Sequence, residues 1–416
     1  FIGNTAGNAV YFENISTPRL DLTQPGEEHN FTTDQEFSLS GEEYTSSTND
    51  IPRNSLKDVD LTGENFADKN LDGELDRDVY PKEILKGYDL QGSNFTDANL
   101  TRIDLSNTDL ENAILKDAIL DGTKLENANK VNLSGAKLKG FNFNQDNLDI
   151  VGNFYETKFG GNNLEAIRNK DIFNNQEFNK SFLKNASFNG HNLSSAKFID
   201  IVDLNTISFG KLIQNGETRR TRLEGAQFNG NGTLNLHGAD LRGFDLKQES
   251  LANGKISLEK KLIDVNLQGE NFSAYEKPEI LQGFDLTESN LKNSILDDLN
   301  LSNTTLDGVS FEGASLSRAT LSGATDVNLS GAKLNNFDFN QDNLDIVGNF
   351  HQTDFRNNNL ENITNKNFFE SQEFNKSNLE YASFNGHNLS NARFIDIDDL
   401  NTISFGKLIQ NGETRR

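Results

Sequence analysis

The chain has 416 residues, with 63 acidic and 39 basic side chains, so its formal net charge is −24 at pH 7. It contains no Cys, Met or Trp, which excludes disulfides, thiolate nucleophiles and zinc sites built on cysteine. Hydrophobic residues make up only 34% of the chain and the mean hydropathy is −0.64, so no stretch is apolar enough to span a membrane. So negative a chain repels phosphate, which argues against direct nucleic-acid binding.

The first 55 residues show little regular pattern. Residues 1–22 correspond loosely to the segment that begins at Thr221, through matches such as Phe12 with Phe228. Residues 23–55 are polar and rich in turn-forming Pro, Gly, Ser and Asn, and they are predicted to form an irregular surface loop.

The insertion at residues 68–78 carries the best candidate for a metal site. Its oxygen-bearing side chains alternate, and Gly73 permits the sharp turn that a calcium loop needs. The candidate Ca²⁺ ligands are Asp68, Asn70, Asp72, Glu74, Asp76 and Asp78. The bidentate Glu that normally closes such a loop is replaced by Val79, and the alternative is an ordinary repeat centred on Leu71. The second half of the chain lacks this insertion, so we expect the fold to require no cofactor.

Leu or Phe recurs at every fifth position through most of the chain. The longest unbroken run is Leu90, Phe95, Leu100, Leu105, Leu110, Leu115, Leu120 and Leu125. A period of five matches neither an α-helix nor a flat strand, and it indicates a coil of short extended segments joined by tight turns. The residue two positions earlier is usually small and shares a face with the large residue. Each pentad is therefore expected to point two residues inward.

Asn and Asp often stand directly before the large residue of a pentad, as Asn94 does before Phe95 and Asn99 before Leu100. Stacked Asn side chains can bond to their copies in adjacent coils. We therefore expect the frequent Asn residues to form ladders along the surface.

The triplets Ser93-Asn94-Phe95, Ala98-Asn99-Leu100, Ala186-Ser187-Phe188 and Ala332-Lys333-Leu334 resemble the repeats of the pentapeptide-repeat proteins. The resemblance covers nearly all of the chain outside residues 23–55. It implies an all-β fold, a right-handed quadrilateral β-helix with four pentads in each coil. Some members of that family are acidic β-helices that bind DNA gyrase.

The chain contains two tandem copies of one solenoid unit. Two segments recur unchanged 196 residues later (339 − 143), residues 143–154 at 339–350 and residues 203–220 at 399–416. We predict a first unit over 1–220, which includes the surface loop and the insertion, and a second over 221–416. Both units end at the same point of the repeat, so we expect the array to continue through further copies or a docked subunit.

The five-residue register slips at equivalent places in the two copies. Leu164 is followed by Phe173 in the first copy, and Leu360 is followed by Phe369 in the second. Because the slips recur, we interpret them as loops or bulges built into the corners of the coil.

No residue cluster marks a catalytic centre. His191 and His387 occupy matching places in the two copies, and both are expected on the face of a coil. Catalysis by His needs an acid or nucleophile within reach, and the sequence shows neither next to them. Nucleophile-elbow, phosphate-loop and zinc signatures are also missing, so the chain is predicted not to be an enzyme.

Arg219, Arg220 and Arg222 form the densest basic cluster, and Arg415 with Arg416 repeats part of it. One interpretation is an ion pair at the end face with acidic loops of a neighbouring subunit. The other is a solvated corner of the coil.

These features predict a structural protein, a secreted or surface-displayed β-solenoid rod that stacks head to tail into a filament or extended array. Its partner would be another copy of itself, because terminal coils expose unpaired N–H and C=O groups that stacking would pair. The expected location is extracellular or at the cell surface. The alternative is a cytoplasmic acidic DNA mimic that binds DNA gyrase and inhibits or protects it.

Overall fold

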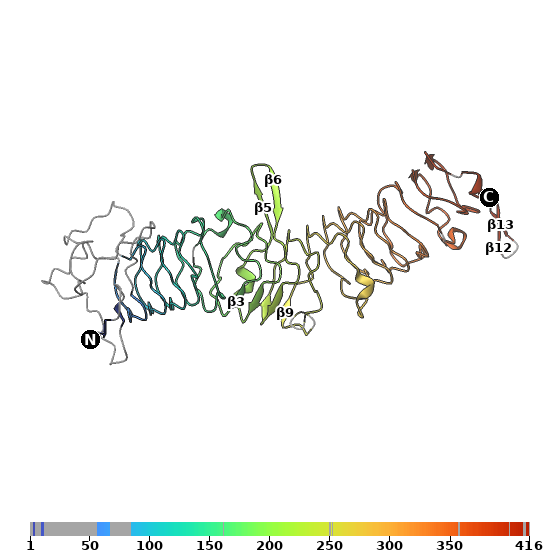
Figure 1. Ribbon diagram of the computed structural model, residues 1–416. Coiled ribbons are helices and arrows are strands. Elements are labelled where there is room, and N and C mark those ends of the chain that lie inside the picture. The colour runs from blue at the N-terminus through green and yellow to red at the C-terminus, as the bar shows by residue number, and fades with distance from the viewer. Residues whose placement is uncertain are drawn as a thin grey trace. The chain divides into compact units, whose positions relative to one another are not determined.

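The computed structural model describes residues 3–4, 10–11, 56–66, 85–160, 162–248, 251, 253–356, 358–398, 400–410 and 413–415. The chain forms two compact units. Figure 1 shows the order of the elements along the chain. Unit 1 comprises 1–187, 195–207 and 227–232, and unit 2 comprises 188–194, 208–226 and 233–416. Within the described ranges, no helix is long and apolar enough to cross a membrane.

Each regular coil has four sides, because paired residues lie 20 positions apart while successive pairs lie five apart. In unit 1 the parallel bridges include Asp89↔Asp109, Asn94↔Ile114, Asn99↔Ile119 and Asp104↔Lys124. In unit 2 they include Asp285↔Thr305, Asn290↔Ser310, Ile295↔Ser315 and Asn300↔Thr320. The predicted all-β, four-sided β-helix is confirmed.

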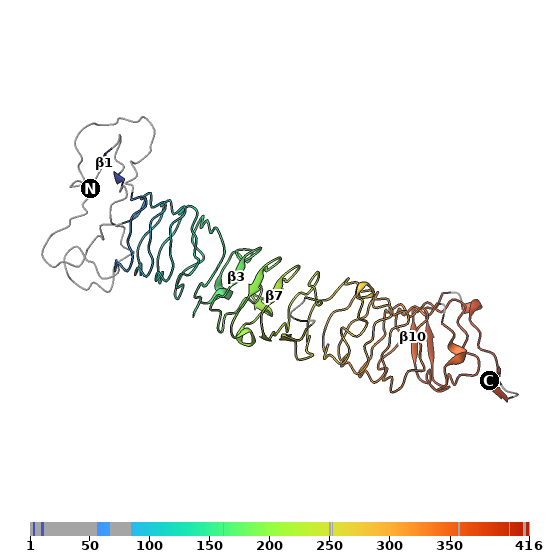
Figure 2. The same ribbon diagram turned by 90° about the horizontal axis from the view of Figure 1, so that it is seen from below.

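Strands of two to four residues also occur among the described residues (Figure 2). Parallel strands are β3 (Glu177–Asn179), β4 (Lys197–Ile199) and β7 (Gln227–Asn229) in unit 1, and β10 (Glu373–Asn375) and β11 (Arg393–Ile395) in unit 2. The antiparallel pairs are β1 (Gly3–Asn4) with β2 (Val10–Tyr11), β5 (Lys211–Gln214) with β6 (Glu217–Arg220), and β12 (Leu408–Gln410) with β13 (Glu413–Arg415). The remaining short strands are β8 (Gly232–Thr233) and β9 (Ile256–Ser257).

A tight turn follows each large residue of a pentad. The Ala98 amide donates a hydrogen bond of 3.0 Å to the Phe95 carbonyl, and Asp97 has a φ of 59°. A positive φ at the third position of the turn is the signature of a type II turn, which favours Gly, Asn and Asp. Gly122 (67°) and Asn107 (61°) occupy the same position in other pentads.

The Asn before the large residue mainly closes this turn. The Asn94 side-chain oxygen accepts a hydrogen bond of 3.0 Å from the Thr96 amide, the local bond that Asn and Asp form readily in turns. The same bond recurs at Asn99, Asn132, Asn192, Asn266, Asn271, Asn290, Asn300, Asn328 and Asn388.

Asn ladders between coils also occur. The Asn147 amide group donates to Asn127 over 2.6 Å, and Asn127 donates to Asn107 over 3.3 Å. The ladder prediction therefore holds at these positions, while turn closure explains more of the Asn content.

The core is a set of side-chain columns along each unit. In unit 1, Phe154, Phe178, Phe198 and Phe228 stack in sequence, with ring centroids 5.2, 4.9 and 4.9 Å apart. Phe154, Phe178 and Phe198 are fully buried and Phe228 is 2% exposed. Close packing of this kind makes the loss of a single ring expensive.

Where the second inward position holds Ser or Thr instead of Ala, the hydroxyl can be hydrogen bonded inside the coil. The buried Ser93 hydroxyl donates to the Leu56 carbonyl over 2.6 Å, and the buried Thr123 hydroxyl donates to the Leu100 carbonyl over 2.7 Å. Burial without such partners would cost free energy, so hydroxyls fit here only because coil carbonyls lie within reach.

The register slips correspond to extra residues at the corners. The coil that pairs Lys158 with Phe182 is 24 residues long (182 − 158) and contains the 3₁₀ turn η1 (Leu164–Ala166). The other 3₁₀ turns are η2 (Leu204–Thr206), η3 (Phe272–Ala274), η4 (Leu360–Asn362) and η5 (Leu400–Thr402). The turns η1 and η4 lie at the slips after Leu164 and Leu360, so the corner interpretation agrees with the structure at these two places.

A core substitution should separate inward from outward aromatic residues in one coil. We expect Phe178→Ala to destabilise unit 1 by about 3–5 kcal/mol, because it leaves a gap in the Phe column. Phe182→Ala removes a ring that is 55% exposed and should cost less than about 1 kcal/mol. Urea unfolding followed by circular dichroism measures both, and equal losses would contradict the inward column.

Candidate functional site

The candidate calcium ligands Asp68, Asn70, Asp72, Glu74, Asp76 and Asp78 lie outside the described residues. Within the part of the chain that the structure describes, no three His, Asp or Glu side chains are grouped closely enough to hold a metal ion.

The prediction that the paired histidines lie on a coil face is wrong. His191 is fully buried and His387 is 4% exposed. Both stand two positions before a Leu, which is the inward position of a pentad; Leu193 is buried and Leu389 is partly buried. His387 Nε2 lies 2.8 Å from the Leu360 carbonyl oxygen, and burial lowers the pKa of His387 below its ordinary value of 6.5. Both residues therefore serve as core residues.

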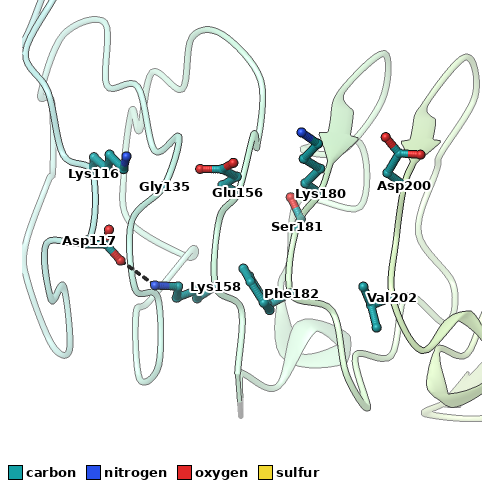
Figure 3. Close-up of a pocket in the computed structure, with 10 residues that line it drawn as sticks. All are labelled: Lys116, Asp117, Gly135, Glu156, Lys158, Lys180, Ser181, Phe182, Asp200 and Val202. Atoms are coloured by element: carbon teal, nitrogen blue, oxygen red, sulfur yellow. Dashed lines mark hydrogen bonds and ion pairs between the residues drawn. The ribbon is translucent and has the colours of Figure 1, made fainter.

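A surface groove of about 690 Å³ crosses successive coils of unit 1 (Figure 3). It is lined by Lys116, Asp117, Gly135, Glu156, Lys158, Lys180, Ser181, Phe182, Asp200 and Val202. Figure 3 shows Lys158, Phe182 and Val202 in one row along adjacent coil segments, below a second row that holds Lys116, Glu156, Lys180 and Asp200. Phe182 is 55% and Val202 67% exposed. The groove thus combines apolar side chains with both signs of charge.

Lysines organise the charges and the aromatic rings of this groove. Lys158 forms an ion pair with Asp117, and its hydrogen bond holds the pKa of that carboxyl below the ordinary 3.8. The same ammonium lies 5.8 Å from the centre of the Phe182 ring, within the range of a cation–π contact. Lys180 lies 5.9 Å from the Tyr155 ring on the same surface.

The second copy does not reproduce this groove. The positions equivalent to Lys116, Lys158, Phe182 and Val202 are Glu312, Asp354, Asn378 and Asp398. Two lysines are thus replaced by acids, and both exposed apolar residues by polar ones. The arrangement in unit 1 suits contact with another macromolecular surface, since its cations are engaged with acids and rings instead of being poised for proton transfer.

A second feature is the hairpin of β5 and β6, which projects from the coils (Figure 1). Its strands pair in the register Lys211↔Arg220 and Ile213↔Thr218. The turn residues Asn215 and Gly216 have φ values of 53° and 78°, as a two-residue type I′ turn requires. Ile213 is 65% exposed.

The base of this hairpin is fastened to a coil of unit 2 by Asp264. Arg220 Nη2 lies 2.6 Å from Asp264 Oδ1, and Lys211 Nζ lies 2.5 Å from Asp264 Oδ2. Arg220 also donates to the Gly238 carbonyl over 2.9 Å. Burial raises the pKa of Asp264, but the hydrogen bonds from Lys211 and Arg220 outweigh it and hold the pKa below 3.8. We call these three charged residues the hairpin latch.

The latch contradicts both interpretations for Arg220, whereas Arg219 and Arg222 are exposed. Arg220 is neither solvated nor held for a neighbouring subunit, because its acid partner lies in the same chain, 44 positions later. Sequence reasoning missed the hairpin and Asp264. The available signals were Asn215-Gly216, which is typical of hairpin turns, and the basic residues at both ends of the hairpin.

A third feature is the coil that contains residues 400–405 of unit 2, where two apolar residues are exposed. Leu400 is 52% and Phe405 49% exposed, although their equivalents in the first copy, Leu204 and Phe209, are 2% and 0% exposed. Phe405 stacks on Phe384 with centroids 5.8 Å apart. We call the surface formed by Leu400 and Phe405 the open coil face.

Comparison with known families identifies the repeats. The model of the pentapeptide repeats matches eight copies, in residues 93–129 and 285–323. These segments lie in the regular four-sided coils of unit 1 and unit 2. Residues 93–129 and 285–323 are therefore pentapeptide repeats.

Solved structures with similarity to the chain include two proteins of known context. A trypsin-treated variant of QnrB1, a plasmid-mediated fluoroquinolone resistance protein, is 16% identical, with 56% of this chain and 86% of that chain covered at a TM-score of 0.20. HetL, a pentapeptide repeat protein involved in heterocyst differentiation regulation from the cyanobacterium Nostoc sp. strain PCC 7120, is 18% identical, with 83% and 86% covered at a TM-score of 0.10. At these TM-scores the superpositions carry no argument. No curated protein matches the sequence significantly.

Removal of the latch carboxylate should produce a pH-dependent loss of stability. We expect Asp264→Asn to destabilise unit 2 by about 1–3 kcal/mol at pH 7, because two cations lose their buried partner. The pKa of Asp264 is depressed in the folded state, so its contribution is present above 3.8 and lost as the pH falls through the folded pKa. The difference between the variant and the wild type should therefore shrink at lower pH.

Asp298→Asn is the matched control for this prediction. Its carboxylate pairs with Arg318 at 2.7 Å, but both side chains are exposed, so little change is expected. Urea unfolding at several pH values measures both variants. A loss for Asp264→Asn that is the same at pH 7 and pH 2 would contradict the role given to the ionised latch.

Proposed function

We propose that the chain is a structural protein whose copies join head to tail into a filament or extended array. The observation that carries the proposal is the open coil face. Phe405 and Leu400 are about half exposed there, while the same residue types are buried at the equivalent places of the first copy. Burying the exposed half of these two side chains is worth roughly 1.5–3 kcal/mol.

The interior of unit 2 shows how such a face is covered. Phe209 is fully buried, and the backbone after it lies against the next coil, where a Cβ added at Gly210 would stand 2.7 Å from the His237 carbonyl oxygen. A further coil on the open coil face would cover Phe405 in the same way. It would also pair backbone groups that a terminal coil leaves unbonded.

Contact between the end of one copy and the start of the next is heterologous. Such a contact joins two different surfaces, so it propagates without limit unless the rotation closes a ring. An array, as opposed to a symmetric dimer, is therefore the assembly expected of this chain. The exposed apolar and ion-paired surfaces of the described residues support protein contact better than catalysis.

A gyrase-binding DNA mimic is the second candidate, supported by the net charge of −24. The groove of unit 1 opposes it, because three lysines and the exposed Phe182 interrupt the acidic surface. A supercoiling assay with DNA gyrase separates the candidates, and inhibition at stoichiometric protein would favour the mimic.

Substitution at the open coil face should prevent assembly. We expect Phe405→Asp to weaken self-association at least about tenfold, because a charge replaces a ring that would be buried. Phe182→Asp is the control, since that ring is equally exposed but lies in the groove of unit 1. Sedimentation velocity and electron microscopy over a range of concentrations measure both. A wild type that stays monomeric at high concentration would overturn the proposal.

A further inference from the structure

We propose that Asp58 receives the C-terminal hairpin of a second copy of the chain. This inference rests on the head-to-tail assembly proposed above and names its polar contact. The template is the hairpin latch, in which Lys211 and Arg220 engage both carboxylate oxygens of Asp264.

Asp58 is the counterpart of Asp264 in the sequence. Residues 56–61 read LKDVDL and residues 262–267 read LIDVNL. The two segments also take the same conformation. Asp58 has a φ of 53° and its amide donates to the Gln91 carbonyl over 2.9 Å, while Asp264 has a φ of 55° and donates to the Thr287 carbonyl over 2.8 Å.

The surroundings of the two carboxylates are also equivalent. The Ser93 hydroxyl donates to the Leu56 carbonyl over 2.6 Å, and the Ser289 hydroxyl donates to the Leu262 carbonyl over 2.7 Å. Each serine also accepts from the amide that follows the aspartate, over 3.4 Å in the first copy and 3.1 Å in the second. The coil around Asp58 thus provides the same backbone platform as the coil around Asp264.

The two sites differ in what covers them. Asp264 is 5% exposed beneath the hairpin of β5 and β6, whereas Asp58 is exposed to solvent. Among the described residues, the Asp58 carboxylate forms no ion pair, so the same backbone setting is open to a basic partner.

The complementary half of the contact lies at the other end of the chain. Strands β12 and β13 pair Leu408 with Arg415 and Ile409 with Thr414, which is the register of β5 and β6 moved by 196 positions. Lys407, the counterpart of Lys211, is exposed. Arg416 is the sequence counterpart of Arg220. Every molecule of the protein therefore carries the C-terminal hairpin that is proposed to contact Asp58.

The polar and apolar parts of this junction have separate roles. The open coil face supplies apolar area, which favours association without fixing an orientation. A cationic hairpin directed at a single carboxylate selects the partner surface and the rotation between copies, as charged contacts commonly do. A chain with net charge −24 repels its own copies, so a local basic contact also offsets that repulsion.

Charge reversal tests the contact. We expect Asp58→Lys and Lys407→Glu each to weaken self-association at least about tenfold, and the double variant to recover much of it, because the reversed charges attract again. Asp97→Lys is the matched control, since Asp97 is also exposed with a φ of 59°. Sedimentation velocity measures the dissociation constant, and circular dichroism confirms that each variant is folded.

Cross-linking provides a direct measurement, because the chain contains no Cys. A chain with Asp58→Cys and Lys407→Cys, treated with a short bis-maleimide, should give a ladder of multimers. An equal mixture of the Asp58→Cys single variant and the Lys407→Cys single variant should give only dimers. Asp97→Cys with Lys407→Cys should give no ladder.

The two proposals fail in different ways. A wild-type chain that remains monomeric would overturn the assembly and this contact together. Self-association that Phe405→Asp abolishes, but that Asp58→Lys leaves unchanged and Asp58→Cys with Lys407→Cys does not cross-link, would overturn only the contact at Asp58.

Discussion

The structure depends on the spacing between parallel coils. Hydrogen-bonded parallel strands lie about 4.8 Å apart. The centroids of stacked aromatic rings lie a similar distance apart. The rings of Phe178, Phe198 and Phe228 accordingly stand 4.9 Å apart. Because every coil repeats the same backbone, a residue type that packs well in one coil packs well on its copy in the next. One geometric requirement therefore selects the Leu and Phe columns, the small residues beside them and the type II turns between them.

Outward-facing residues are free of this requirement, and those of the groove differ between the two copies. The inward Ser181 and Ser377 both donate to the carbonyl of a buried Phe in the adjacent coil. One position later, Phe182 in the first copy becomes Asn378 in the second. The amphipathic groove of unit 1 is therefore a property of one copy, whereas the core beneath it is common to both. Function in such a scaffold is expected on these outward positions.

Stacking also leaves a coil end that must be covered. Within the chain, the end of the first copy is covered by the coils that follow, and the hairpin latch fastens it through Asp264. The open coil face and the exposed Asp58 present the two halves of this junction separately. The internal junction thus serves as a model for a contact between molecules, in which apolar area supplies affinity and the basic hairpin supplies orientation.

The sequence alone determined the four-sided β-helix, the two inward positions and the tandem copies, because the five-residue period maps directly onto repeating backbone geometry. It also located the corner slips, since these interrupt that period. Only the tertiary structure decided the roles of the side chains outside the period. His191 and His387 are buried because they fill the inward small position, and Arg220 reaches an aspartate 44 positions away. Such contacts depend on which side chains of different coils reach one another, and the five-residue pattern does not encode that.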